Sequence, residues 1–235
     1  MPRMTGKRSY EDGCAAAHAL DLIGERWALL VVRELLLGPK RFTDLRAGLP
    51  GISPNVLTQR LQELEQVSVL HRRKLEPPAS TWVYELTEWG AGLEVVVGEL
   101  GKWAARSPVL PRNAPLSVTS LILSFRNMFD PVAAEGFAAS YELRFGEDRF
   151  HAEVADGQID IHRGGASHPD ATIQCDDPNI LAALVYDRRD LAEALRSGVI
   201  SYVGNKAALK HFLKLFTLPA PATASEVGWV SAAGA

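Results

Sequence analysis

Hydrophobic positions between residues 15 and 105 recur every three or four places, a spacing typical of amphipathic helices. Helices are expected at residues 15–23, 25–37, 41–47, 53–66 and 88–105. Between the last two helices, strand-like runs at residues 69–75 and 82–86 surround a turn that contains two prolines. This order predicts a helical domain with one hairpin and a closing helix.

The second half of the chain combines both kinds of pattern. Alternating strand-like runs are expected at residues 141–145, 150–154, 159–161 and 171–174. Helices are expected at residues 117–128, 179–186, 190–196 and 205–216. The fold class is therefore α+β, with an N-terminal helical domain and a C-terminal α/β domain.

A proline-rich segment separates the two patterns. Three prolines fall between residues 108 and 115, where they remove backbone donors and oppose helical geometry. We predict a domain at 1–107, a linker at 108–116, a second domain at 117–220 and a tail at 221–235.

The helices at 41–47 and 53–66, followed by a basic hairpin, have the order of a winged helix-turn-helix. Ser53 caps the second helix, with proline at the next position. Leu57, Leu61 and Leu64 mark its buried stripe, so the opposite face would enter the major groove of DNA.

Polar side chains on that face suit base recognition, because Asn and Gln bond adenine in a bidentate way and Arg bonds guanine or phosphate. The helix N-terminus can hold a phosphate, and the basic hairpin can lie over the minor groove or its phosphates. The candidate DNA-binding residues are Arg41, Thr43, Ser53, Asn55, Thr58, Gln59, Arg60, Gln62, Arg72, Arg73 and Lys74. Each could alternatively be ordinary solvated surface; their combination in this order favours DNA.

The net charge of −3 hides a basic patch. Residues 1–107 carry 14 Lys and Arg against 13 Asp and Glu, whereas residues 108–235 carry 11 against 15. Between residues 38 and 74, seven basic residues face three acidic ones. Local patches rather than totals attract phosphate.

Residues 14–104 resemble the HxlR-type winged-helix transcription regulators. The resemblance rests on Cys14, Gly24-Glu-Arg-Trp27, Leu37-Gly-Pro39, Arg41-Phe42-Thr-Asp-Leu45, Leu49-Pro-Gly-Ile-Ser53, Leu57-Thr-Gln-Arg-Leu61, Leu64-Glu65, Arg72-Arg73, Tyr84-Glu-Leu-Thr87 and Gly90. It implies a homodimer on palindromic double-stranded DNA, with residues 15–23 and 88–105 at the dimer interface. One departure is Ser68, where the family usually has glycine after the recognition helix.

Cys14 matches a position that some members of this family use to sense oxidants or electrophiles. A thiol near a helix start can react as a thiolate. The alternative is a structural cysteine.

The segment from residue 170 to 218 resembles the sterol-carrier-protein fold. The matching motifs are Ala171-Thr-Ile, Asp176-Asp-Pro178, Leu195-Arg-Ser-Gly198, Val199-Ile-Ser-Tyr-Val-Gly204 and Ala208-Leu-Lys-His-Phe-Leu-Lys-Leu-Phe216. The resemblance implies an apolar cavity for a lipid or another hydrophobic small molecule. Its candidate lining residues are Leu121, Phe125, Phe129, Leu184, Leu195, Phe212 and Phe216, each of which could instead be plain core.

Other functional classes find little support in the sequence. Its apolar stretches are too short for a membrane span, and the basic N-terminus lacks the apolar region of a secretory signal. Two cysteines and six scattered histidines form no disulfide framework or metal motif, and motifs for hydrolysis, nucleotides or other cofactors are absent. We expect a cytoplasmic protein that is not an enzyme and needs no cofactor or metal.

Three hypotheses follow. The first is a dimeric, sequence-specific transcriptional regulator whose second domain binds a hydrophobic effector. The second is a lipid-binding carrier or accessory protein whose winged helix contacts other proteins. The third is a thiol-based sensor that acts through Cys14.

Overall fold

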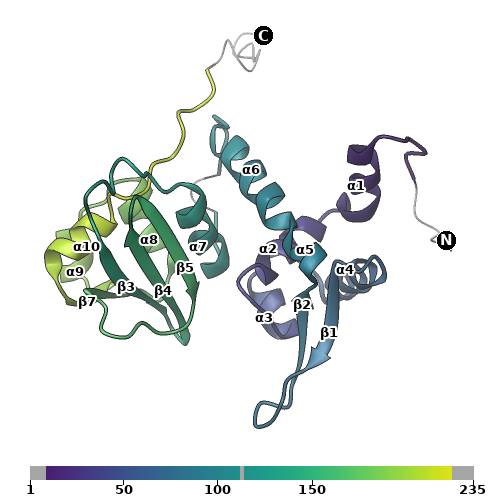
Figure 1. Ribbon diagram of the computed structural model, residues 1–235, viewed down its shortest axis with the longest axis horizontal. Coiled ribbons are helices and arrows are strands. Elements are labelled where there is room, and N and C mark those ends of the chain that lie inside the picture. Colours follow the sequence, from purple (N-terminus) through teal and green to yellow (C-terminus); the bar gives the residue numbers. More distant parts are fainter. Residues whose placement is uncertain (1–8, 112–113, 224–235) are drawn as a thin grey trace. The chain divides into compact units, whose positions relative to one another are not determined.

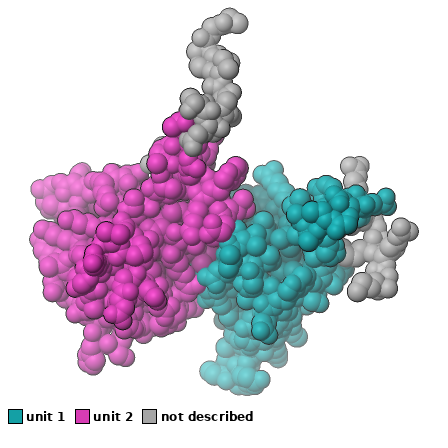
Figure 2. Space-filling model, turned by 45° about the horizontal axis from the view of Figure 1, so that its top comes forward, with its two compact units in different colours: residues 1–97 teal, residues 98–235 magenta. Residues whose placement is uncertain are grey.

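The computed structural model describes residues 9–111 and 114–223, which divide into two compact units (Figure 2). The division falls between Val97 and Gly98, inside helix α6 (Leu93–Ala105), and the domain boundary at residue 107 stays a prediction. Within the second unit Gly98 lies close to Asn127, since a Cβ on Gly98 would be 2.8 Å from Oδ1 of Asn127. The predicted tail lies outside the described residues from 224 onward.

The first unit contains the expected helices and hairpin (Figure 1). Its elements are α1 (Ala15–Ile23), α2 (Ala28–Leu35), α3 (Phe42–Ala47), α4 (Pro54–Gln66), β1 (Leu70–Lys74), β2 (Trp82–Leu86) and α5 (Glu88–Ala91), with the first turn of α6. The predicted helix at 25–37 begins later, because Trp27 has a φ of 79° and so interrupts the helical conformation. The predicted helix at 88–105 is divided into α5 and α6 at Gly92.

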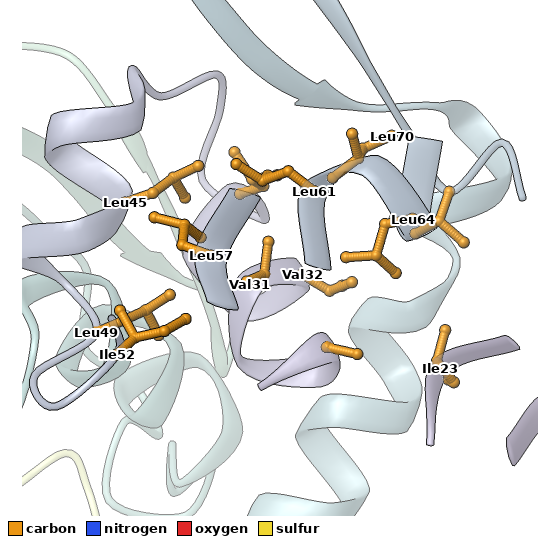
Figure 3. Packing of buried hydrophobic residues seen from close by; sticks show 13 residues of the cluster. Ile23, Val31, Val32, Leu45, Leu49, Ile52, Leu57, Leu61, Leu64 and Leu70 are labelled. Carbon is orange, nitrogen blue, oxygen red and sulfur yellow. The ribbon is translucent and has the colours of Figure 1, made fainter. Parts of the chain in front are cut away.

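The core of the first unit lies between α2, α3 and α4 (Figure 3). Leu57, Leu61 and Leu64 of α4 are each no more than 1% exposed and face Val31 and Val32 of α2. Burial of a leucine side chain contributes about 1.5–3 kcal/mol, so this stripe orients α4 strongly. The opposite face of α4 is left to solvent.

Both ends of α4 are fixed by local hydrogen bonds and backbone geometry. Ser53 Oγ accepts the backbone N–H of Val56, as expected for a cap. At the other end Ser68 takes the left-handed conformation itself, with a φ of 59°, where the family resemblance led us to expect an altered cap. The N–H of Val69 bonds to Leu64 O, so the chain turns directly into β1.

The hairpin, which we call the wing, is an antiparallel pair in which Leu70 lies opposite Leu86 and Lys74 opposite Trp82. Lys40 forms an isolated β-bridge with β2, because its backbone N–H and C=O both bond to Tyr84. The wing is therefore tied to the segment that joins α2 to α3.

A buried carboxylate links this segment to α2. Glu34 is fully buried, and its oxygens accept hydrogen bonds from Lys40 Nζ at 2.7 Å and Arg33 Nη2 at 2.8 Å. Gly48 makes room for it, since a Cβ at that position would lie 2.4 Å from Glu34 Oε2. Burying a charge is costly unless such partners compensate it.

The second unit is a five-stranded sheet with helices (Figure 1). Its elements are α7 (Val118–Asn127), β3 (Ala139–Phe145), β4 (Asp148–Ala155), β5 (Gln158–Arg163), β6 (Ala171–Gln174), α8 (Pro178–Tyr186), α9 (Leu191–Arg196), β7 (Ser201–Gly204) and α10 (Lys206–Phe212). The strand order is β5-β4-β3-β6-β7, in which only the pairing of β3 with β6 is parallel. The α+β class predicted from the sequence is confirmed.

Aromatic side chains join the helices of this unit to its sheet. Phe125 of α7 stacks on Phe216 at 4.4 Å between ring centroids and meets Phe212 of α10 edge-on at 5.5 Å. Tyr141 of β3 lies 4.9 Å from Phe212. Among the helices of the described residues, none is long and apolar enough to cross a membrane.

We predict that Glu34→Gln destabilises the first unit by on the order of 3 kcal/mol, because Lys40 and Arg33 then lose the carboxylate they share in a poorly hydrated site. Urea unfolding followed by circular dichroism measures the change. The matched control is Glu99→Gln, which removes an exposed ion pair with Lys102 and should change stability by less than about 1 kcal/mol. Equal effects of the two variants would contradict the structural role of Glu34.

Candidate nucleic-acid interface

The solvent-facing side of α4 carries the polar residues that the sequence assigned to base recognition. Asn55, Thr58, Gln59 and Gln62 are all exposed, as is Ser53 at the helix start. Gln59 Nε2 donates to Glu63 Oε1 at 3.0 Å, and Thr58 Oγ1 donates to the carbonyl of Pro54 at 2.9 Å. The face thus offers amide groups and one methyl group, which suit base edges in the major groove.

Arg60 does not belong to this face. It is 8% exposed, and its guanidinium forms ion pairs with Glu63 on the next turn and with Glu25 at 3.6 Å. The structure therefore does not place Arg60 on the exposed face that the sequence predicted for it, because its side chain is buried among these ion pairs. The helical spacing already indicates this burial, because position 60 lies three residues after Leu57 and four before Leu64, at the edge of the buried stripe.

Helix α3 presents Arg41 and Thr43 at its exposed start. The Asp44 carboxylate accepts the backbone N–H of Arg41 at 3.3 Å and the hydroxyl of Thr43 at 3.1 Å. This arrangement satisfies donors of the first turn and fixes the helix start beside the residues that precede α4.

The wing divides its three predicted cations between two faces. Arg73 pairs with Glu85, and this hydrogen bond holds the pKa of the Glu85 carboxyl below its usual value. His71 lies 3.6 Å from the same carboxylate. Arg72 and Lys74 are exposed at the alternate positions of the strand. The charge of Arg73 is thus largely compensated, whereas Arg72 and Lys74 carry no such carboxylate contact among the described ion pairs.

Sequence reasoning missed two residues of the wing, Trp82 and Glu85. The guanidinium carbon of Arg72 lies 4.5 Å from the ring centroid of Trp82 and 5.9 Å from that of Tyr84. Hairpin register could have revealed both, since Glu85 lies opposite His71 and Trp82 lies opposite Lys74, one pair diagonal to Arg72 on the same face.

Cys14 is exposed immediately before α1. The backbone N–H groups of Ala17 and Ala16 favour its thiolate and lower the pKa of the thiol below its usual value. Burial has the opposite effect at Cys175 and raises the pKa of that thiol.

The residues predicted to line a hydrophobic cavity mostly pack against one another. Leu121, Phe125 and Phe212 are fully buried, and Phe216 stacks on Phe125. Phe129 meets Phe216 edge-on at 6.2 Å. Side chains therefore occupy much of the space where the sterol-carrier resemblance implied a ligand.

A pocket of about 260 Å³ in the second unit lies between α8 and α9 instead. Of the predicted lining residues it includes Leu184, beside Ile180, Ala194, Val199 and the charged Arg189 and Glu193. Among the described residues, no group of three or more His, Cys, Asp or Glu is placed to hold a metal ion.

The comparisons with known proteins agree with this geometry. Residues 22–109 match the model of the HxlR-like helix-turn-helix family. The uncharacterized HTH-type transcriptional regulator YvaP of Bacillus subtilis is 40% identical over 86 residues, which cover 37% of this chain and 80% of that protein. The HTH-type transcriptional regulator YodB of the same organism is also 40% identical over 86 residues, covering 37% of this chain and 77% of that protein.

A solved structure, the reduced form of B. subtilis YodB, is 36% identical with a TM-score of 0.37 and covers 41% of this chain and 95% of that chain. The exposed face of α4, its adjoining wing and the 40% sequence identity with the regulators YvaP and YodB lead to one conclusion. The chain belongs to the HxlR family of helix-turn-helix proteins and is a DNA-binding transcriptional regulator.

Proposed function

We propose that this regulator acts as a homodimer on palindromic double-stranded DNA, in the cytoplasm and without catalysis of its own. The supporting observation is the pairing of an exposed polar face on α4 with an exposed apolar stripe along α5 and α6. In helix-turn-helix dimers, two recognition helices occupy half-sites about one helical turn of DNA apart.

For sequence recognition we assign base contacts to Asn55, Gln59 and Gln62, and apolar contact with thymine to Thr58. The exposed start of α4 at Ser53, together with Arg41 and Thr43 of α3, would hold backbone phosphates. From the wing, Arg72 and Lys74 are the phosphate or minor-groove contacts, and Arg73 is left out because Glu85 compensates it.

Dimerisation is proposed from an uncovered helix face. Val96, Leu100 and Trp103 of α6 recur at four and three residues and are 48–74% exposed, and Trp89 of α5 is 58% exposed. Leu20 of α1 is 51% exposed as well. Contiguous exposed apolar side chains at helical spacing are costly in water and typically pair with another helix. The simplest occupant is the same stripe of a second copy, which forms an isologous interface.

For effector binding, the pocket between α8 and α9 is the supporting observation. Apolar side chains beside three charged ones, Arg189, Asp190 and Glu193, suit a small amphipathic molecule, because pockets bind through apolar area and orient through few polar groups. The sterol-carrier resemblance of this unit remains a prediction, and any ligand among Phe125, Phe212 and Phe216 would have to displace packed rings.

We predict that Arg72→Ala weakens binding to the cognate duplex by on the order of tenfold and lowers the slope of log affinity against log salt by about one, because one phosphate contact is lost. Fluorescence anisotropy against salt concentration measures both quantities. The duplex is selected by the wild-type protein from a random library or taken from DNA upstream of its own gene.

Arg73→Ala is the matched control, since it removes the same charge from the neighbouring strand position. Its effect should be less than about twofold, because Glu85 already compensates that charge in the free protein. If both variants bind and respond to salt like the wild type, the wing does not contact DNA.

We predict that Val96→Glu converts the dimer to monomer and abolishes cooperative binding to a palindrome, because a carboxylate would be buried without a partner in the interface. Analytical ultracentrifugation measures the mass. The control is Val132→Glu, which makes the same change at a 79% exposed valine off the stripe. A wild-type mass for Val96→Glu would place the dimer interface elsewhere.

A thiol-sensing role is the second candidate, supported by the exposed, low-pKa Cys14. We predict that iodoacetamide alkylates Cys14 much faster than Cys175 in the folded protein, with a rate that levels off below the pH at which a free thiol ionises. Mass spectrometry of quenched samples measures both rates. The sensing role itself requires that oxidant weakens DNA binding by the wild type and that Cys14→Ser removes this effect. If Cys14→Ser responds to oxidant like the wild type, the sensing role is refuted.

A further inference from the structure

One face of the wing combines a cation with two aromatic rings. Arg72 lies over Trp82 at 4.5 Å and over Tyr84 at 5.9 Å, measured from the guanidinium carbon to each ring centroid. The hairpin register accounts for this contact, because Arg72 lies opposite Tyr84 and Trp82 sits two residues earlier on the same strand. Trp82 is 50% exposed, so burial in a core does not explain its presence.

The geometry of a stacked guanidinium leaves its donors available. Contact with an aromatic ring uses the planar face of the group, whereas the five N–H donors lie in its plane and point outward. An arginine side chain loses rotamer entropy when it is fixed in a complex. An aromatic ring that already limits these rotamers in the free protein reduces the entropy that remains to be lost on binding.

The backbone of Arg72 is fixed to the recognition helix. Its N–H donates to Oε1 of Glu65 at 3.1 Å, near the C-terminal end of α4. One contact therefore sets the position of the Arg72 backbone relative to α4, and the aromatic rings set the direction of its side chain. Arg73 has neither contact and is instead bound to Glu85.

We propose that Trp82 is a positioning residue for DNA binding: its indole ring orients the Arg72 guanidinium so that the in-plane donors meet the DNA backbone. The inference rests on the proposed contact of Arg72 with DNA and adds a residue whose role is exerted through that cation. Tyr84 is the second, more distant ring of the same platform.

The test is a double-mutant cycle on the full chain with the selected duplex. Trp82→Leu should weaken binding two- to fivefold, the range of an exposed cation–π contact, and leave the salt slope at the wild-type value because no charge is removed. Trp82→Phe keeps an aromatic face and should restore most of the affinity. In the Arg72→Ala background, Trp82→Leu should have no further effect.

The outcomes separate the inference from the proposed function. If Arg72→Ala weakens binding while Trp82→Leu does not, the wing contact stands and the positioning role is overturned. A Trp82→Leu loss of the same size in both backgrounds would also overturn it, because Trp82 would then contact DNA itself. Wild-type affinity of Arg72→Ala would refute the wing contact and the inference together. Unfolding midpoints of the Trp82 variants show whether the fold is kept. If Trp82→Leu unfolds, affinity of Trp82→Phe that is no higher than that of Arg72→Ala would overturn the positioning role.

Discussion

The position of the candidate DNA-binding surface depends on one buried carboxylate. The buried Glu34 carboxylate accepts a hydrogen bond from Lys40 Nζ, and the backbone of Lys40 pairs with Tyr84 in the wing. The same side chain accepts from Arg33, which also approaches the carbonyl of Gly48 in the turn after α3. An apolar residue at position 34 could also be packed there, but it would not fix the positions of Lys40, Arg33 and the turn at Gly48. The ion-pair cluster thus sets wing and helices relative to each other.

The number of cations on the wing matters less than which of them are paired with a carboxylate. The basic run of β1 gives three adjacent cations, yet the cross-strand carboxylate of Glu85 leaves them unequal. What remains is a positive face at Arg72 and Lys74 beside aromatic rings. A mildly acidic chain can therefore bind a polyanion, because affinity depends on where the uncompensated positive charge lies. Salt screens the repulsion from acidic groups that lie farther away.

Helical periodicity predicted most of the first unit correctly, because the buried stripe Leu57, Leu61 and Leu64 follows from helix geometry alone. The errors arose where a partner comes from a distant part of the chain. Arg60 was assigned to the DNA face from its residue type and its place on α4, whereas its ion pair with Glu25, 35 residues earlier in the chain, cannot be seen in the helical pattern. In the second unit, the helices and strands could be predicted from the sequence, but the volume of a ligand cavity could not. Whether Phe125, Phe212 and Phe216 surround a cavity or fill it depends on how they pack, which hydrophobic periodicity does not show.

The closeness of Gly48 to Glu34 also constrains how this sequence can vary. A methyl group at position 48 would occupy the place of a carboxylate oxygen, so alanine there is compatible with this fold only if residue 34 becomes shorter or rotates away. A shorter residue at 34 would in turn leave two cations without their common acceptor. Substitutions at these two positions, fourteen residues apart, are therefore expected to occur together, along with a neutral residue at position 40.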